Sequence, residues 1–280
     1  MQKNVLNTDL SGKVAVVTGA AGVLCRGFSK SLAAAGAKVA LLGRTLETLQ
    51  QLADEINADG GIAKAYVCDV LDKDRCYAVA DAVEQDFGKC DILINGAGGN
   101  NPKATTDQEY FSLDDTTRTF FDLDVDGVST VFNLNFLGTL VPTQAFARQM
   151  VGRTGCSIIN ISSMNAYTPL TKIPAYSGAK AAISNFTQWL AVHFSKVGIR
   201  VNAIAPGFFV SKQNQSLLFH EDGTPTPRAG KILAATPMER FGEAKELEGA
   251  LLFLLNEEAA SFITGVVIPV DGGFSAYSGV

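Results

Sequence analysis

The 280-residue chain has few charged residues, few histidines and no long apolar run. Charged residues make up 18% of it, the formal net charge is −5, and no basic block is present, which argues against a nucleic-acid partner. No run reaches the ~18 apolar residues that a bilayer span needs, and residues 1–10 lack the apolar core of a signal peptide. We therefore expect a cytoplasmic protein that binds neither nucleic acid nor membrane.

Cysteine and histidine are also sparse. The cysteines are odd in number and lack any Cys-x-x-Cys spacing, so buried free thiols in a reducing compartment are expected. With two histidines and no His-Glu-x-x-His motif, a metal site is not expected. The residues in question are Cys25, Cys68, Cys76, Cys90 and Cys156, and His193 and His220.

Hydrophobic residues, at 47%, are abundant and ordered in a repeating pattern. Short apolar runs predict buried strands at 13–18, 38–42, 64–68, 91–95, 157–161, 200–204 and 266–270. Helical patterns lie between them, at 24–35, 45–59, 72–87, 130–150, 175–197 and 245–255. This alternation predicts an α/β fold with one Rossmann-type, doubly wound parallel sheet and helices on both faces. No linker interrupts it, so residues 1–280 are interpreted as a single domain.

Two polar segments do not fit the alternation, at about 99–127 and 208–241. Both follow predicted strands, at the sheet edge where open α/β folds bind ligands. Long loops there are candidate substrate lids. Solvated surface decoration or a contact between subunits would explain them equally well.

The first predicted strand is followed by a glycine-bearing turn that opens a helix, with Gly19 and Gly22 in the turn. Such a turn lets a dinucleotide's phosphates approach a helix N-terminus. The second strand ends at Gly43-Arg44, where no carboxylate would repel a 2′-phosphate and the arginine can pair with one. This favours NADP(H), with NAD(H) as the alternative, because an arginine can also stack on adenine.

The candidate catalytic residues lie near the fifth strand. Tyr176 and Lys180 are four residues apart, on one face of the expected helix. A lysine cation near a phenol favours the phenolate, so we expect Lys180 to lower the pKa of Tyr176 and prepare it for proton transfer. Ser163, thirteen residues before the tyrosine, can polarise the same oxygen. The alternative is an ordinary surface Tyr and Lys on a helix.

With these pieces placed, the sequence resembles the short-chain dehydrogenase/reductase family over nearly its whole length. The matching stretches are Thr18-Gly19, Asp69-Val70, Asn95-Gly96-Ala97-Gly98, Asn135, the trio Ser163, Tyr176 and Lys180, Pro206-Gly207 with Ser211, and Asp271-Gly272-Gly273. The resemblance implies a hydride-transferring oxidoreductase in which Asn135 joins Ser163, Tyr176 and Lys180 in catalysis. It also implies a set of cofactor-binding residues: Gly19, Gly22, Val23, Leu24, Asp69, Val70, Asn95, Ala97, Pro206 and Ser211, with Tyr176 and Lys180.

The sequence differs from the family pattern at a few positions. The family's Gly-x-x-x-Gly-x-Gly would place glycines where Val23 and Cys25 stand. Gly96 replaces an asparagine, and Ser211 replaces a threonine. The first two changes put the details of the pyrophosphate turn in doubt, and Gly96 lacks a hydrogen-bonding side chain.

More closely, the sequence is similar to the D-mannonate oxidoreductases (fructuronate reductases) of this family. The stretches that carry this likeness are 22–25, 99–102, 162–165, 170–174, 205–209 and 273–280. The similarity implies reduction of D-fructuronate to D-mannonate. Lys172 is the candidate for binding the substrate carboxylate, with Asn101 and Asn165 for its hydroxyls. Asn100, Lys103, Lys212 and Arg228 are further candidates.

Two other functions remain open. One is a different sugar-acid or polyol reductase, such as a gluconate 5-dehydrogenase type, with the same fold and catalytic residues. The other is a dinucleotide-binding sensor without activity, which would not need all four catalytic residues. The long helices near Thr130 and Ala175 can pair across a two-fold axis, so a homodimer or homotetramer is expected by resemblance.

Overall fold

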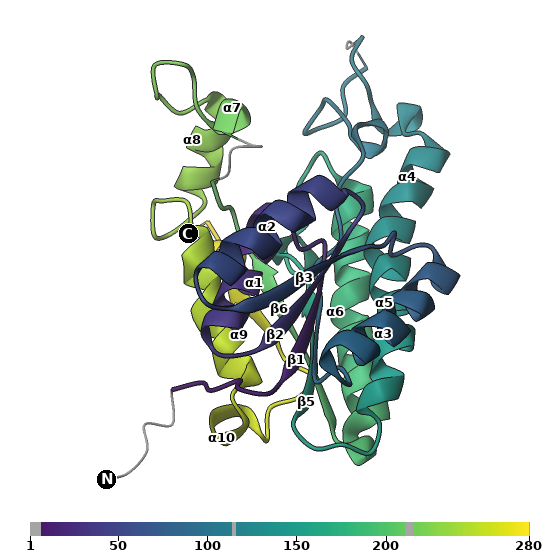
Figure 1. The fold of residues 1–280 in the computed structure, drawn as a ribbon. Helices are drawn as coiled ribbons and strands as arrows, with labels where there is room; N and C mark the ends of the chain where they lie inside the picture. Colours follow the sequence, from purple (N-terminus) through teal and green to yellow (C-terminus); the bar gives the residue numbers. More distant parts are fainter. Residues whose placement is uncertain (1–6, 114–115, 211–214, 280) are drawn as a thin grey trace.

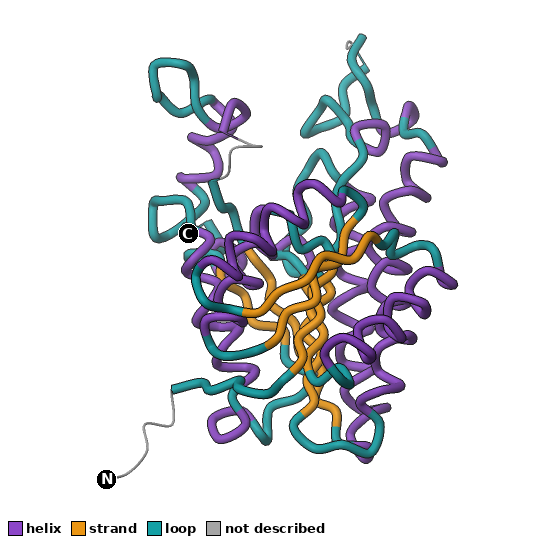
Figure 2. Tube along the Cα trace, in the orientation of Figure 1, coloured by secondary structure: helices purple, strands orange, loops and turns teal. Residues whose placement is uncertain are grey.

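A single seven-stranded sheet forms the centre of the molecule (Figures 1 and 2). The computed structural model describes residues 7–113, 116–210 and 215–279. The strand order is β3-β2-β1-β4-β5-β6-β7, and every neighbouring pair is parallel. The predicted Rossmann-type fold is therefore confirmed. The strands are β1 Val14–Thr18, β2 Lys38–Gly43, β3 Ile62–Val67, β4 Ile92–Asn95, β5 Cys156–Ile161, β6 Ile199–Pro206 and β7 Val267–Val270.

The central strands are buried on both faces, which explains their uninterrupted apolar sequences. All residues of β1, β4 and β5 are buried. One face packs against α1, α2 and α9, and the other against α3, α5 and α6, so the core has two halves separated by the sheet. The helices are α1 Val23–Ala34, α2 Leu46–Ala58, α3 Lys73–Phe87, α4 Val125–Phe132, α5 Gly138–Met150, α6 Pro174–Phe194, α7 Gln215–Leu218, α8 Pro227–Ala234, α9 Glu248–Leu255 and α10 Glu257–Ala260.

The helix expected at 130–150 is different in two respects. It begins earlier, at Val125, because the Asp124 side chain caps the helix by accepting a hydrogen bond from Gly127 N at 2.5 Å. It is also divided by a π-helical turn, Asn133–Leu137, between α4 and α5. A π-turn inserts one extra residue into the helical repeat, and such turns occur often at functional sites. This one contains Asn135.

The first lid segment (residues 99–127) and the second lid segment (residues 208–241) both lie beyond the strand ends (Figure 1). The first contains two short 3-10 turns and the beginning of α4, and the second contains α7 and α8. An ion pair joins them, because Lys231 Nζ lies 2.8 Å from a carboxylate oxygen of Glu109. The described parts of the two segments are therefore in contact with each other.

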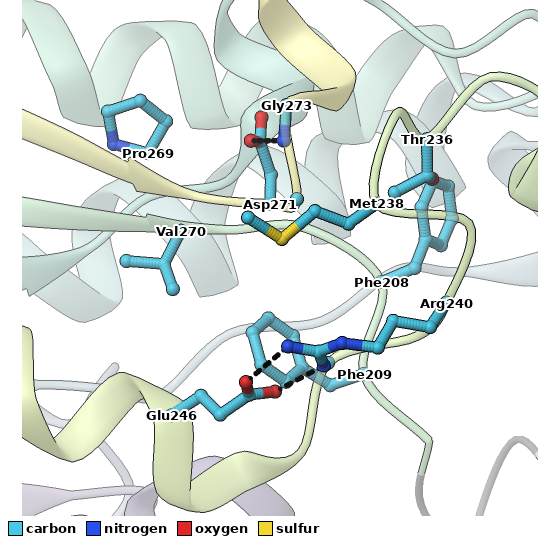
Figure 3. Close-up of a pocket in the computed structure, with 12 residues that line it drawn as sticks. Phe208, Phe209, Thr236, Met238, Arg240, Glu246, Pro269, Val270, Asp271 and Gly273 are labelled. Carbon is cyan, nitrogen blue, oxygen red and sulfur yellow. Dashed lines mark hydrogen bonds and ion pairs between the residues drawn. The ribbon is translucent and has the colours of Figure 1, made fainter.

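The two ends of the second lid segment meet at one point. Gly242 N donates a hydrogen bond to Phe208 O at 2.9 Å, and a Cβ at position 242 would lie 2.4 Å from the Phe209 ring. Beside this junction Arg240 binds Glu246 through two nitrogen–oxygen contacts of 2.8 and 2.6 Å (Figure 3). The segment is thus a loop with a fixed base, and a cavity of about 400 Å³ lies at that base.

All five cysteines are free and buried, as the sequence predicted. Among the described residues, no helix has the length and apolar character needed to cross a membrane.

Candidate active site

The turn after β1 is shaped by glycine. Gly19 has φ of +63°, and a Cβ there would lie 3.0 Å from Ala97 Cα, so both backbone angle and space favour glycine. Thr18 Oγ1 accepts hydrogen bonds from Gly96 N at 3.1 Å and Ala97 N at 3.2 Å. These two bonds hold the end of β1 against the residues that directly follow β4.

Helix α1 begins with unused hydrogen-bond donors. Gly22 is its N-cap residue, and no side chain caps the first turn. Val23 and Leu24, both half-buried, are the first two helical residues. The free N–H groups and the helix dipole make this end a site for an anion such as a pyrophosphate. The Val23 and Cys25 departures therefore do not remove the helix N-terminus on which the predicted phosphate site depends.

The residues expected near adenosine lie at the ends of β2 and β3. Arg44 directly follows β2, and its side chain is exposed with no partner among the described residues. Asp69 is exposed beyond β3, and its Oδ1 accepts a hydrogen bond from Leu71 N at 3.0 Å. Val70 is buried and contacts α5 next to Gly138. Arg44 is therefore available to a phosphate or to an adenine ring.

One residue of the expected cofactor site uses its side chain elsewhere. The Asn95 side chain points into the core, where its amide nitrogen donates to Thr143 Oγ1 and to Asn160 Oδ1, each at 2.9 Å. Asn95 can therefore meet a cofactor only through its backbone. Pro206 ends β6 and is buried, while Ser211 lies outside the described residues.

Tyr176 and Lys180 share one face in the first two turns of α6. Lys180 is only 4% exposed, and its Nζ donates a hydrogen bond to Ile161 O at 2.8 Å. The same nitrogen lies 5.5 Å from the centre of the Tyr176 ring. The lysine is therefore held at the end of β5 by the backbone, with the tyrosine ring beside it.

Ser163 completes the cluster from the end of β5. It lies close enough to Tyr176 to lower the pKa of the phenol, against the rise that burial causes. Ser163 Oγ also accepts from Asn165 N at 3.3 Å, because Ser163 caps the short 3-10 turn Met164–Ala166. The cap fixes the serine rotamer, so the two hydroxyls face the same space.

Asn135 reaches this cluster from the π-turn. Its amide nitrogen donates to Gly99 O at 2.7 Å and to Val131 O at 2.8 Å. A Cβ at Gly98 would lie 2.7 Å from Asn135 Oδ1 and 3.2 Å from Lys180 Nζ. The asparagine oxygen and the ammonium group therefore converge on Gly98. Among the predicted catalytic residues, the structure brings all four together.

The electrostatics differ from the expectation in one respect. Burial lowers the pKa of Lys180 to about 8. Burial also raises the pKa of Tyr176 above its usual value, and the hydrogen bond from Ser163 opposes that rise. The expected lowering of the Tyr176 pKa by Lys180 is not met here, because burial outweighs the opposing effects and the lysine's hydrogen bond goes to Ile161 O.

A cavity of about 430 Å³ lies between the lid segments and the loop before α6. Lys172, Arg228 and Lys231 line it, against one carboxylate, that of Glu109. Nearby cations Lys231 and Lys172 hold the pKa of Glu109 below its usual value. The rings of Phe208 and Phe274 form an apolar wall, with centroids 5.3 Å apart and an edge-to-face arrangement. The cavity therefore has the charge for an acidic ligand and a flat surface for its C–H groups.

The three predicted substrate-binding residues differ in their burial and in the hydrogen bonds that they already make. Lys172 is half-buried in the cavity wall, and its carbonyl accepts a hydrogen bond from Thr106 N of the first lid segment. Asn165 is 4% exposed, and its Oδ1 has no partner among the described residues. Asn101 uses its Oδ1 to cap a 3-10 turn by accepting from Lys103 N at 2.9 Å.

Glu109 was missed by the sequence analysis. Nothing in its local sequence distinguishes it from the other acidic residues of the first lid segment. Only the fold places it opposite Lys231, which lies 122 positions later.

The comparisons with known proteins agree with this arrangement. The family model described as short chain dehydrogenase matches residues 13–221. An uncharacterized oxidoreductase of Haemophilus influenzae is 64% identical over 98% of this chain and 97% of its own. A crystal structure of a proposed D-mannonate oxidoreductase from the same species, with bound NAD, has 63% identity, a TM-score of 0.95 and 99% coverage of both chains. Gluconate 5-dehydrogenase of Gluconobacter oxydans is 35% identical over 95% of this chain and 96% of its own.

Proposed function

The chain belongs to the short-chain dehydrogenase family and is an NAD(P)-dependent oxidoreductase, and from that premise we propose that it reduces the keto group of a hexuronate, D-fructuronate, to give D-mannonate. The observation that carries the substrate class is the excess of positive charge in the cavity between the lids, where three cations face one carboxylate. The D-mannonate name carried by the 63% identical structure supports the same substrate. An acidic sugar would place its carboxylate on these cations and its C–H face on the phenylalanine rings.

Four residues would carry the reaction. When bound, NAD(P)H supplies the hydride that adds to the keto carbon. Tyr176 is protonated at neutral pH, because its pKa lies above the usual value for a tyrosine. It donates its hydroxyl proton to the oxygen that becomes the alcohol. Ser163 hydrogen-bonds the same oxygen. Lys180, with a pKa of about 8, can return a proton to the tyrosine, and Asn135 fixes the lysine's surroundings.

Binding of the substrate is assigned to the cavity wall. Lys172 would pair with the carboxylate, because it is half-buried and lies four residues before Tyr176. Asn165 would bind a hydroxyl, because its buried Oδ1 has no partner among the described residues and a buried polar atom without one is costly. Asn101, occupied as a cap, is a weaker candidate for the same role.

The test is a substrate panel followed by loss of NAD(P)H absorbance. Keto-uronates, 5-ketogluconate and neutral ketoses are compared with NADH and NADPH in parallel. The proposal expects the highest kcat/KM with fructuronate. A higher value with 5-ketogluconate would favour the second candidate, a gluconate 5-dehydrogenase type, which the 35% identical relative supports. Tight cofactor binding without turnover of any carbonyl would favour the sensor.

The choice between the two cofactors rests on opposing observations. Arg44, exposed at the end of β2 and without a partner in the described part of the chain, supports the sequence-based preference for NADP(H). The NAD bound in the 63% identical structure supports NAD(H). We propose that Arg44 lets the enzyme accept NADPH as well as NADH.

We also propose that the protein is a cytoplasmic homodimer or homotetramer. Its five free cysteines suit a reducing compartment. Helix α6 carries exposed apolar side chains, with Trp189 55% and Val192 77% exposed. A second copy packed on this face would bury them. Light scattering coupled to size exclusion tests this, and Trp189→Glu should shift the mass toward the monomer.

A further inference from the structure

Within the described part of the chain, one of the three cations that line the cavity between the lids is in contact with a carboxylate, and two are not. Lys231 Nζ lies 2.8 and 2.9 Å from the two carboxylate oxygens of Glu109. Lys172 and Arg228 line the same cavity without an ion pair of their own among the described residues. A ligand therefore finds two cations available and a third that is already neutralised.

Glu109 is ionised at neutral pH. The hydrogen bond from Lys231 holds its pKa below the usual value for a glutamate, and the charge of Lys172 adds to this effect. An ionised carboxylate can accept a hydrogen bond but cannot donate one. The Glu109 oxygens are therefore suited to a hydroxyl group of a ligand, whereas they repel a carboxylate of a ligand.

Both members of this pair are held at the cavity by neighbouring contacts. In the first lid segment, Thr106 N, three residues before Glu109, donates a hydrogen bond to Lys172 O at 3.0 Å. In the second lid segment, Ile232 lies next to Lys231 in α8 and is buried in a small apolar cluster. The two lids therefore present the carboxylate and the ammonium group to each other at one wall of the cavity.

We propose that Glu109 is a specificity-determining residue, which occupies Lys231 and thereby sets the cavity to accept a ligand with one carboxylate and to reject a ligand with two. The single carboxylate pairs with Lys172 or Arg228, and hydroxyl groups of the ligand meet the Glu109–Lys231 pair. A second carboxylate finds Lys231 occupied and faces the charge of Glu109. The inference rests on the proposed function for the presence of a sugar acid in this cavity, and it adds that the sugar acid ends in a CH₂OH group rather than in a second carboxylate.

The test compares D-mannonate with D-mannarate, in which a carboxylate replaces the terminal CH₂OH group. Isothermal titration into the enzyme–NADH complex measures both affinities, because neither ligand has a keto group that NADH could reduce. Glu109→Gln should bind D-mannarate about tenfold more tightly than the wild type does, and D-mannonate within about threefold, because it removes the repulsion and frees Lys231. Lys231 is 67% exposed, so solvent screening keeps the change from being larger.

A pair that served only to hold the lids together would give a different result. Its loss would loosen both lids, and Glu109→Gln would then weaken the two ligands by a similar factor. That result, or an affinity for D-mannarate that does not rise, would overturn the proposal.

Lys231→Met perturbs the pair in the opposite direction. It leaves Glu109 without its partner, so the glutamate competes with the ligand for Lys172. D-Mannonate should then bind about fivefold more weakly, and D-mannarate should gain nothing. Adding Glu109→Gln should return D-mannonate to within about threefold of the wild type. A double variant without this recovery, or a Lys231→Met variant that gains affinity for D-mannarate, would overturn the proposal.

Glu257→Gln is the matched control. Glu257 forms an ion pair of 2.9 Å with Lys13, near α10 and at the end of the molecule away from α8 (Figure 1). The variant changes the net charge by the same amount and should leave both affinities as they are. An equal gain for D-mannarate in Glu257→Gln would indicate a general effect of charge and would overturn the assignment to Glu109.

These affinities are measured without turnover. A substrate panel in which fructuronate is not reduced would refute the proposed function, and the ratio of the two affinities would still test Glu109. An unchanged ratio in Glu109→Gln would refute the specificity role and leave the proposed function in place.

Discussion

Replacing Lys180 with methionine should make the protein more stable while removing its activity. Lys180 is almost fully buried, and burial lowers its pKa from 10.5 to about 8. At about 1.36 kcal/mol per pH unit, the difference of about 2.5 units corresponds to about 3 kcal/mol of lost stability when the lysine is charged. Methionine has a similar length and no charge, so it removes this cost.

Part of the gain will be offset. The substitution leaves Ile161 O without its 2.8 Å hydrogen bond, and an unpaired buried carbonyl costs about 1–3 kcal/mol. The net gain in free energy of unfolding at pH 7 is therefore expected to be about 0–2 kcal/mol. The loss of packing from the longer lysine side chain is small, because methionine fills nearly the same volume.

The sign of the pH dependence identifies the cause. With a folded-state pKa of about 8 against 10.5 when unfolded, the lysine's cost is fully present below pH 8 and disappears as the pH rises toward 10.5. The stability advantage of Lys180→Met should therefore shrink across this window. Urea unfolding of both proteins from pH 6 to 10 measures it, and groups that titrate in both proteins cancel in the difference. A difference that stays constant with pH, or a less stable variant at pH 7, would refute the reasoning.

Three further substitutions test the assigned roles. Tyr176→Phe should lower kcat by about 10²–10⁴-fold, because it removes the proton donor, while NADH affinity stays nearly unchanged; full turnover would refute the role. Lys172→Ala should raise KM about tenfold or more for a keto-uronate and change it little for a neutral ketose, because a charged hydrogen bond is lost; equal effects on both would remove the carboxylate role. Arg44→Ala should raise KM for NADPH about tenfold more than KM for NADH, and a parallel rise for both cofactors would indicate stacking on adenine.

The fold was predictable because its sequence signals are local. The strands of the sheet are short apolar runs that need burial on both faces, and the glycine turns mark where helices begin. The π-turn at Asn135 was not predictable, because the apolar pattern around it continues as in an ordinary helix. A tertiary contact stabilises the π-turn, because the side-chain amide of Asn135 donates a hydrogen bond to Gly99 O in the segment after β4.

Spacing together with the family resemblance placed the catalytic residues, but neither gave their electrostatics. A spacing of four puts Tyr176 and Lys180 on one face of a helix. The spacing does not show that Lys180 donates its hydrogen bond to Ile161 O. Nor does it show that burial raises the pKa of Tyr176 and lowers that of Lys180, which favours the neutral form of each. Those depend on strands and loops remote in the sequence.

The side chain of Asn95 shows a similar limit. A motif gives its position at the end of β4, whereas its partners, Thr143 and Asn160, come from α5 and β5. A resemblance can therefore predict where a residue lies in the fold, whereas the direction of its side chain depends on the core residues that pack around it.

The base of the second lid segment has an evolutionary consequence. The backbone leaves the body at Phe208 and returns at Gly242, and the junction is secured by its own hydrogen bond and by the neighbouring Arg240–Glu246 pair. The last part of the segment is also tied to the residues after β7, since Met238 N donates to Gly272 O, so changes in length are expected to be tolerated best before that point. New substrate preferences can thus arise by replacing one insert, while the hydride-transfer machinery is inherited unaltered.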